Sequence, residues 1–203
     1  MKRKGSFLIS VGILMILAAL GIFGYNLYEN YSVNQKNDVI LETLTTKQEK
    51  DHTALYRQYP DIPMPVVEID GLQYVGTIEA KCIELNTPVL ASYDAKTMEV
   101  TPALYSGTAY KKDMLILGHN YQSCFGKLAN LKVGDELQFI DNSKNKFYYE
   151  VSDIFIAGED EFDVILSDEE PWDFTMFTCT WSGFERVVIR CMLIKDVPAM
   201  MNQ

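Results

Sequence analysis

Histidine is scarce in this sequence, with only two among 203 residues. His52 lies in a polar stretch, which leaves His119 as the one imidazole placed like a catalytic group. The four cysteines form no CxxC pair and show no cysteine–histidine spacing typical of a zinc site. Basic residues are also in the minority, 18 against 28 acidic ones. The sequence therefore contains no motif typical of a zinc site, and its excess of acidic residues argues against nucleic acid as a partner.

Charge is absent from residues 5–28, directly after three basic residues at positions 2–4. The apolar stretch Phe7–Tyr25 approaches the roughly 20 residues that a membrane-spanning helix needs. Basic flanks stay on the cytoplasmic side of a membrane. We therefore predict a cytoplasmic flank over residues 1–6, a transmembrane anchor over 7–28 and an extracellular remainder.

A cleaved signal peptide is the alternative for this stretch, because Ala18, Gly21 and Gly24 are small residues of the kind found before a cleavage site. The apolar run is longer than a typical signal core, and no Ala-x-Ala site closes it. We favour an uncleaved, single-pass anchor in the cell membrane, with the lipid bilayer as the partner of this segment.

Proline and glycine are absent from residues 26–59. The abundance of Gln, Lys, Glu and Leu there favours helix, although the apolar residues are too sparse for a strong stripe. This pattern predicts a membrane-proximal stalk over residues 29–60 that is partly helical. Prolines at positions 60, 63 and 65 interrupt it, and the folded domain is expected over residues 61–203.

Short segments rich in β-branched and aromatic residues dominate this domain and indicate strands. The expected strands are Tyr74–Ile78, Cys82–Leu85, Met114–Gly118, Glu136–Asp141, Lys146–Ile156, Phe174–Thr178 and Glu185–Ile194. Helical candidates are few: Ser123–Asn130 and a turn around Asp163–Leu166. Many short strands with long loops predict an all-β domain that closes, or nearly closes, into a barrel.

The two last strands read as an antiparallel hairpin whose connection contains Gly183. If the connection is Thr180–Glu185, Cys179 and Arg186 face each other, with Cβ atoms about 4.5–5.5 Å apart. Arg190 lies on the same face but about 13 Å further along the strand, so we favour Arg186 as the partner of the thiol. A buried structural cysteine beside a surface arginine is the alternative interpretation.

His119 supports the catalytic interpretation, because it follows four apolar residues and Gly118 at the end of an expected buried strand. A cysteine nucleophile is typically activated by an adjacent histidine and oriented by a third group. Cys179, His119 and Arg186 are therefore the candidate catalytic residues.

The motifs around these residues resemble those of sortases, the cysteine transpeptidases of Gram-positive cell surfaces. The run Thr175–Cys179, reading TMFTC, is similar to their Thr-Leu-x-Thr-Cys signature, with Met176 in place of the usual Leu. Arg186 and the apolar residues after it resemble the arginine strand of the family, and Leu117–Asn120 resembles the segment that holds its histidine. The similarity extends more loosely from about Gly71 to Ile194.

The resemblance implies an eight-stranded barrel and a definite chemistry. Cys179 would attack a backbone carbonyl of a Leu-Pro-x-Thr-Gly-like C-terminal sorting signal, His119 would transfer protons, and Arg186 would stabilise the oxyanion. It also makes Thr178 a candidate for substrate binding. Secreted proteins carrying such a signal would be donors, and an amine of a cell-wall precursor or of a pilin would be the acceptor.

Two other functions stay open on the sequence alone. One is a surface thiol peptidase that hydrolyses the same intermediate, although the order of histidine before cysteine differs from that of papain-like enzymes. The other is a non-enzymatic surface β-barrel that binds a peptide or glycan.

No cofactor is predicted, with calcium as the alternative. The acidic cluster at 159, 160, 161 and 163 offers the hard oxygen ligands that calcium prefers, and some sortases bind calcium near the equivalent position. The cluster lacks the regular spacing of a calcium loop. Once Cys179 is reserved as a nucleophile, Cys82, Cys124 and Cys191 leave an odd number, so no disulfide set is predicted.

Overall fold

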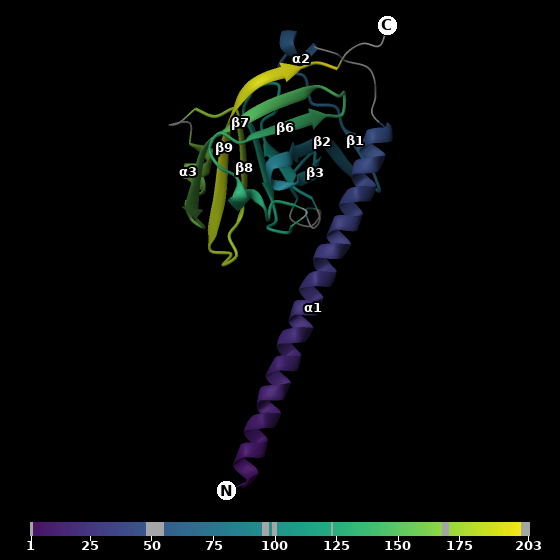
Figure 1. The fold of residues 1–203 in the computed structure, drawn as a ribbon. Helices are drawn as coiled ribbons and strands as arrows, with labels where there is room; N and C mark the ends of the chain where they lie inside the picture. Colours follow the sequence, from purple (N-terminus) through teal and green to yellow (C-terminus); the bar gives the residue numbers. More distant parts are fainter. Residues whose placement is uncertain are drawn as a thin grey trace.

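A ring of β-strands, with one long helix leaving it, makes up most of the described chain (Figure 1). The computed structural model describes residues 2–47, 55–94, 98, 101–122, 124–167 and 171–199, and for residues 2–10 and Lys47 the backbone only. The helical elements are α1 (Lys2–Lys47), α2 (Leu55–Gln58), α3 (Phe162–Leu166) and the 3-10 turns η1 (Lys81–Ile83) and η2 (Leu128–Asn130). The strands are β1 (Val67–Ile69), β2 (Leu72–Ala80), β3 (Leu85–Leu90), β4 (Ala103–Ser106), β5 (Met114–Gly118), β6 (Glu136–Asp141), β7 (Lys146–Gly158), β8 (Phe174–Cys179) and β9 (Glu185–Val197).

Eight of these strands close on themselves, which confirms the eight-stranded barrel. The strand order is β1-β2-β3-β4-β5-β8-β9-β7-β6, and an additional pairing of β2 with β6 joins the two ends. The short β1 lies outside the ring, and within the described residues its strand partner is β2. Most neighbours are antiparallel, but β3 runs parallel to β4 and β5 runs parallel to β8. The carboxyl ends of β5 and β8 therefore meet at the same rim.

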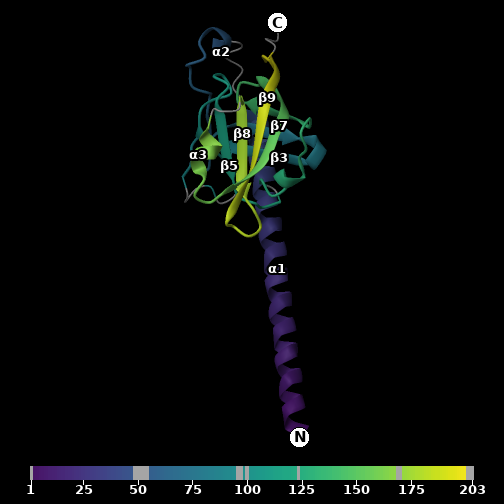
Figure 2. The ribbon, with the colours of Figure 1, turned by 90° about the vertical axis from the view of Figure 1, so that its left-hand side faces the viewer.

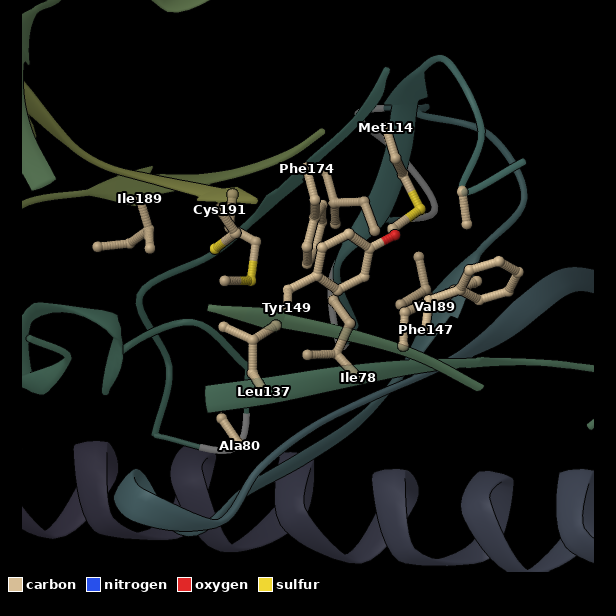
Figure 3. Packing of buried hydrophobic residues seen from close by; sticks show 14 of the residues in the cluster. Ile78, Ala80, Val89, Met114, Leu137, Phe147, Tyr149, Phe174, Ile189 and Cys191 are labelled. Carbon is tan, nitrogen blue, oxygen red and sulfur yellow. The ribbon is translucent and has the colours of Figure 1, made fainter. Parts of the chain in front are cut away.

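The interior of the ring is filled by large apolar side chains (Figure 3). Aromatic residues dominate its centre, and Tyr149 and Phe174 pack with ring centroids 5.0 Å apart. Alternate residues of each strand point inward, as the pleat of a strand requires. A smaller apolar cluster lies on the outer face of β5, β8 and β9 and is covered by α3; its buried members are Leu115, Ala157, Ile165, Phe177 and Val188.

The predicted β8–β9 hairpin is confirmed together with its register. The two strands pair antiparallel, and Cys179 lies opposite Arg186. The Thr180 N–H donates to the Glu185 carbonyl at 2.9 Å, which closes the connection at the residues expected from the sequence.

Three local expectations were wrong. The segment Cys82–Leu85 is not a strand: the chain makes the η1 turn there, Glu84 takes a left-handed conformation (φ +51°), and β3 begins only at Leu85. The helix expected from Ser123 is reduced to η2, because main-chain hydrogen bonds fold the preceding residues back on the end of β5; Ser123 itself lies outside the described residues. The strands β1 and β4 were missed, since three or four residues show too little alternation.

Helix α1 has two different halves. Its apolar N-terminal half extends away from the ring, with every described large side chain from Val11 to Tyr28 exposed (Figures 1 and 2). By length and composition it is apolar enough to cross a membrane. Its C-terminal half lies against β1 and β3, where Val33, Asn37 and Leu44 are buried. The helix is thus continuous from the predicted anchor into the predicted stalk, while the division of the chain into domains stays a prediction.

Candidate active site

The parallel pairing of β5 and β8 brings His119 and Cys179 side by side. Gly118 lies opposite Thr178 in this pair, and His119 and Cys179 are the next residue of each chain. Neighbouring strands are about 4.8 Å apart. His119 and Cys179, which are sixty residues apart in the sequence, therefore lie in adjacent positions at one rim of the barrel.

The three candidate catalytic residues also lie on one face of the sheet. Side chains alternate along a strand, so His119 shares a face with Leu117, and Cys179 shares one with Phe177. Leu117 and Phe177 both belong to the apolar cluster on the outer face. Arg186 joins this face because it lies directly opposite Cys179.

A cavity of about 300 Å³ opens where these side chains meet. His119, Cys179 and Arg186 all line it, and each is partly exposed. Its walls are largely apolar, with Tyr105 from β4 and Phe162 from α3 in edge-to-face contact at 5.3 Å. The arrangement places a thiol, an imidazole and a guanidinium around one shared space.

Arg186 and Arg190 occupy different environments. The Arg186 Nη1 atom donates to the carbonyls of Gly183 and Glu185, at 2.9 and 3.2 Å, which holds the guanidinium at the cavity rim. Arg190 is only 5% exposed. Its Nη2 donates to the carbonyls of Val164 and Ser167 at 3.0 and 2.9 Å, so Arg190 fastens α3 to the sheet and does not line the cavity.

Close packing around Gly118 fixes the position of His119. A Cβ atom at Gly118 would lie 2.8 Å from the Phe125 ring and 2.9 Å from the Cys124 sulfur, so a larger residue would push this loop away. The His119 carbonyl accepts from the Phe125 N–H at 3.0 Å. The Asn120 Nδ2 atom donates to the Thr180 carbonyl at 3.3 Å and ties the end of β5 to the hairpin.

Comparison with known proteins decides the family. The model of the Sortase domain matches residues 78–194 of this chain, which is more than half of its length.

The chain belongs to the sortase family.

Solved structures of sortases share the fold at low sequence identity. Sortase A of Listeria monocytogenes is 18% identical, with a TM-score of 0.55 over 63% of this chain and 91% of its own. A sortase D5 transpeptidase of Clostridium perfringens is 21% identical, with a TM-score of 0.57 over 81% and 99%. Sortase C of Streptococcus pneumoniae is 16% identical, with a TM-score of 0.56 over 87% and 91%. Comparison with curated proteins gives no match.

Thr178 lies beside the sortase site in an unexpected orientation. The residue lines the cavity, but the alternation of β8 directs its side chain to the face opposite that of Cys179. Its hydroxyl is buried and has no hydrogen-bond partner within the part of the chain that the structure describes. A role for Thr178 in substrate binding stays a prediction.

Sequence reasoning missed the neighbours of His119 on the side away from Cys179. The His119 and Tyr121 rings are in edge contact at 5.7 Å, and the Tyr121 hydroxyl donates to Glu29 Oε1 of α1 at 3.2 Å. A second cavity of about 400 Å³, lined by Tyr25, Tyr28 and Glu29, reaches His119 from this side. Nothing in the sequence links Glu29 to a histidine ninety residues later, because only the packing of α1 against the sortase barrel brings them together.

The other three cysteines do not line the cavity that holds Cys179. All four cysteines are free thiols, and Cys124 and Cys191 are fully buried. Burial raises the pKa of Cys124 to about 12 and also raises the pKa of Cys191. Cys82 is exposed, and partial burial of its thiol together with the charge of Asp135 raises its pKa.

The acidic residues at 159, 160, 161 and 163, which were considered as calcium ligands, do not form a common metal site in the described structure. Within the described residues, no three His, Cys, Asp or Glu side chains are close enough to hold a metal ion. In this cluster the Glu161 carboxylate instead accepts a hydrogen bond from the Gly158 N–H at 2.8 Å.

Proposed function

We propose that this sortase is a membrane-anchored cysteine transpeptidase that transfers a C-terminal sorting signal to an amine. The observation that supports this most directly is the shared cavity lined by His119, Cys179 and Arg186 on one face of three neighbouring strands. The donor would be a secreted protein with a Leu-Pro-x-Thr-Gly-like signal. The acceptor would be an amine of a cell-wall precursor or a pilin lysine, and the Streptococcus pneumoniae neighbour is itself described in terms of pilin substrate specificity.

The chemistry follows from the placement of the three side chains. The Cys179 thiolate attacks a backbone carbonyl of the signal, and the S–C bond that forms creates an oxyanion. The Arg186 guanidinium, which is permanently charged and fork-shaped, stabilises that negative charge. His119 gives its proton to the leaving amine as the C–N bond breaks, which leaves a thioacyl enzyme.

The second half of the reaction reverses these roles. His119 takes a proton from the incoming amine, the amine attacks the thioacyl carbonyl, and the S–C bond breaks to restore the thiolate. Water in place of the amine would give hydrolysis instead. All of these steps use side chains of this chain. Thr178, next to Cys179 in the sequence, is proposed as a contact for the substrate.

Mass spectrometry of the full chain in detergent tests this proposal with a panel of sorting-signal peptides, with and without an added amine. We expect an acyl adduct on Cys179 and, when amine is present, a peptide joined to that amine. Cys179→Ala should abolish both products. The buried thiols Cys124 and Cys191 serve as internal controls, since neither should carry the adduct.

The products distinguish the alternatives. A hydrolysed peptide that is unchanged by added amine would replace transpeptidation by thiol-peptidase activity. Peptide binding without any covalent adduct would show a non-enzymatic binding module and would refute the proposal.

A further inference from the structure

The connection of the catalytic hairpin carries two strongly exposed aromatic residues. Trp181 is 90% exposed and Phe184 is 72% exposed. Only Ser182 and Gly183 lie between them, so the four-residue tip has no charged side chain. Such exposure of large aromatic groups on a surface indicates an interaction site.

Hydrogen bonds hold this tip in a defined turn. The Gly183 N–H donates to the Thr180 carbonyl at 3.0 Å, and Gly183 takes the positive φ of +78° that the turn requires. The hydroxyls of Thr180 and Ser182 are 2.9 Å apart, and the Arg186 guanidinium donates to the Gly183 carbonyl. The two exposed aromatic side chains therefore extend from a turn whose backbone is held by several hydrogen bonds.

The tip extends in the same direction as the apolar half of α1. In Figures 1 and 2 the β8–β9 connection reaches beyond the rest of the barrel on the side toward which α1 runs to its N-terminus. The rim from which it starts is level with Glu29, because Glu29 is hydrogen-bonded to Tyr121 and lines a cavity with His119. Two extended residues beyond Cys179 carry the chain about 7 Å past this rim. This distance equals four to five residues of helix rise, which brings the tip to about the level of Tyr25.

Tyr25 and Tyr28 mark the end of the apolar run of α1 and are exposed by 65% and 69%. Tryptophan and tyrosine prefer the interface between hydrocarbon and water, where one part of the ring is apolar and the other is hydrated. The chain after residue 28 has 15 basic and 28 acidic residues. An anionic bilayer surface would repel such a domain, and an uncharged aromatic tip is the part suited to enter it.

We propose that Trp181 and Phe184 insert into the outer interface of the bilayer that α1 crosses. This goes beyond the transpeptidase function and rests on α1 as a membrane span. The bilayer then holds the barrel at two places, the helix and the hairpin tip. Cys179 and Arg186, which flank the tip, are kept at the membrane surface with their cavity in a fixed orientation.

The two tryptophans of the chain allow a direct test, since they lie at opposite ends of β8. Trp172 precedes the strand and donates from Nε1 to the Ser167 carbonyl at 3.1 Å. It lies nine residues before Trp181, which is about 30 Å along the chain at strand rise. The full chain is reconstituted in phosphatidylcholine nanodiscs with or without a spin label near the lipid headgroup. In Trp172→Phe the labelled lipid should quench most of the fluorescence of the remaining Trp181. The emission of Trp181 should also lie at a shorter wavelength than that of a tryptophan peptide dissolved in water. In Trp181→Phe the remaining Trp172 should not be quenched.

Each other outcome overturns the inference. Quenching of Trp181 by aqueous iodide but not by labelled lipid would place the tip in water. Protection from iodide that requires a sorting-signal peptide would assign the tip to substrate binding, and protection that requires crowding of several chains per disc would assign it to self-association. If Trp172→Phe does not fold, the difference between the wild type and Trp181→Phe reports Trp181 alone. The measurement needs no turnover, so Cys179→Ala should give the same quenching even if the chain is not a transpeptidase.

Discussion

Two arginines four residues apart in β9 differ in role because of the partners that the sheet assigns to them. Arg186 lies opposite Cys179 at the open rim, whereas Arg190 lies opposite Thr175 in the buried part of the strand. Arg190 also stacks over the Phe155 ring, with its Cζ atom 5.2 Å from the ring centroid. Removing one cation should affect the chemistry, and removing the other should affect the fold.

We predict that Arg186→Ala lowers the transpeptidation rate by roughly 10² to 10³, by analogy with the loss of one oxyanion-stabilising group. Thermal unfolding should change little, since Arg186 is partly exposed and, among the described residues, its hydrogen bonds go to carbonyls of its own turn. The measurement is kcat/KM with a sorting-signal peptide, alongside a melting curve in the same detergent. Unchanged turnover in this variant would show that Arg186 has no role in the reaction.

Arg190→Ala should behave in the opposite way. The change removes two charge-assisted hydrogen bonds to the end of α3, each worth about 1.5–3 kcal/mol in general, and leaves their carbonyls without these donors. We expect a lower melting temperature, while the folded fraction keeps turnover near that of the wild type. A larger loss of kcat/KM in Arg190→Ala than in Arg186→Ala, with both variants folded, would reverse the assignment of the oxyanion group.

At the scale of the elements, α1 is both a candidate membrane span and a structural part of the barrel. Leu44 is 1% exposed and belongs to a cluster with Ile69, Tyr74 and Leu90 of the sheet. The same helix also supplies Glu29 to the hydrogen bond with Tyr121 beside His119. The orientation of the helix is therefore linked to the immediate surroundings of the active site.

We predict that Leu44→Ala destabilises the fold by about 2–5 kcal/mol, as for other buried leucines. For a chain of this size that corresponds to a fall in melting temperature of roughly 5–15 °C. Val39→Ala on the same helix is the matched control, because Val39 is 60% exposed. Near-UV circular dichroism during heating in detergent gives the comparison. Equal melting temperatures for the two variants would mean that α1 does not pack on the barrel in solution.

At the scale of the whole molecule, the charge distribution predicts an orientation across a membrane. All three basic residues near the N-terminus precede the uncharged run, and every acidic residue follows it. The acidic remainder is also the part that carries the barrel and its cavity. From the positive-inside tendency we predict that the barrel lies outside the cell.

We predict that protease added to intact cells removes the barrel and leaves only a fragment that contains residues 1–28. Lysed cells provide the control for cleavage that does not depend on orientation. Immunodetection of a tag at the C-terminus measures the loss. A barrel that resists protease until the cells are lysed would place it on the cytoplasmic side.

The sequence alone determined the parts of this protein that depend on local patterns. The uncharged run, the alternation of the longer strands and the turn chemistry around Gly183 are all local, and they led to the helix, the all-β domain and the β8–β9 register. The family resemblance also came from short motifs, because TMFTC ends β8 and LGHN spans the end of β5 and the two residues after it. Short strands such as β1 and β4 escaped detection because three or four residues carry too little pattern.

Tertiary structure alone decided what depends on contacts between distant segments. The pairing of β5 with β8 put His119 next to Cys179, and the alternation of β8 turned the Thr178 side chain away from that face. The packing of α1 brought Glu29 to Tyr121, and it directed the apolar half of the helix to the same side of the barrel as the hairpin tip (Figure 1). No local pattern encodes these proximities, since they arise only when closure of the barrel and burial of the helix face fix all the segments at once.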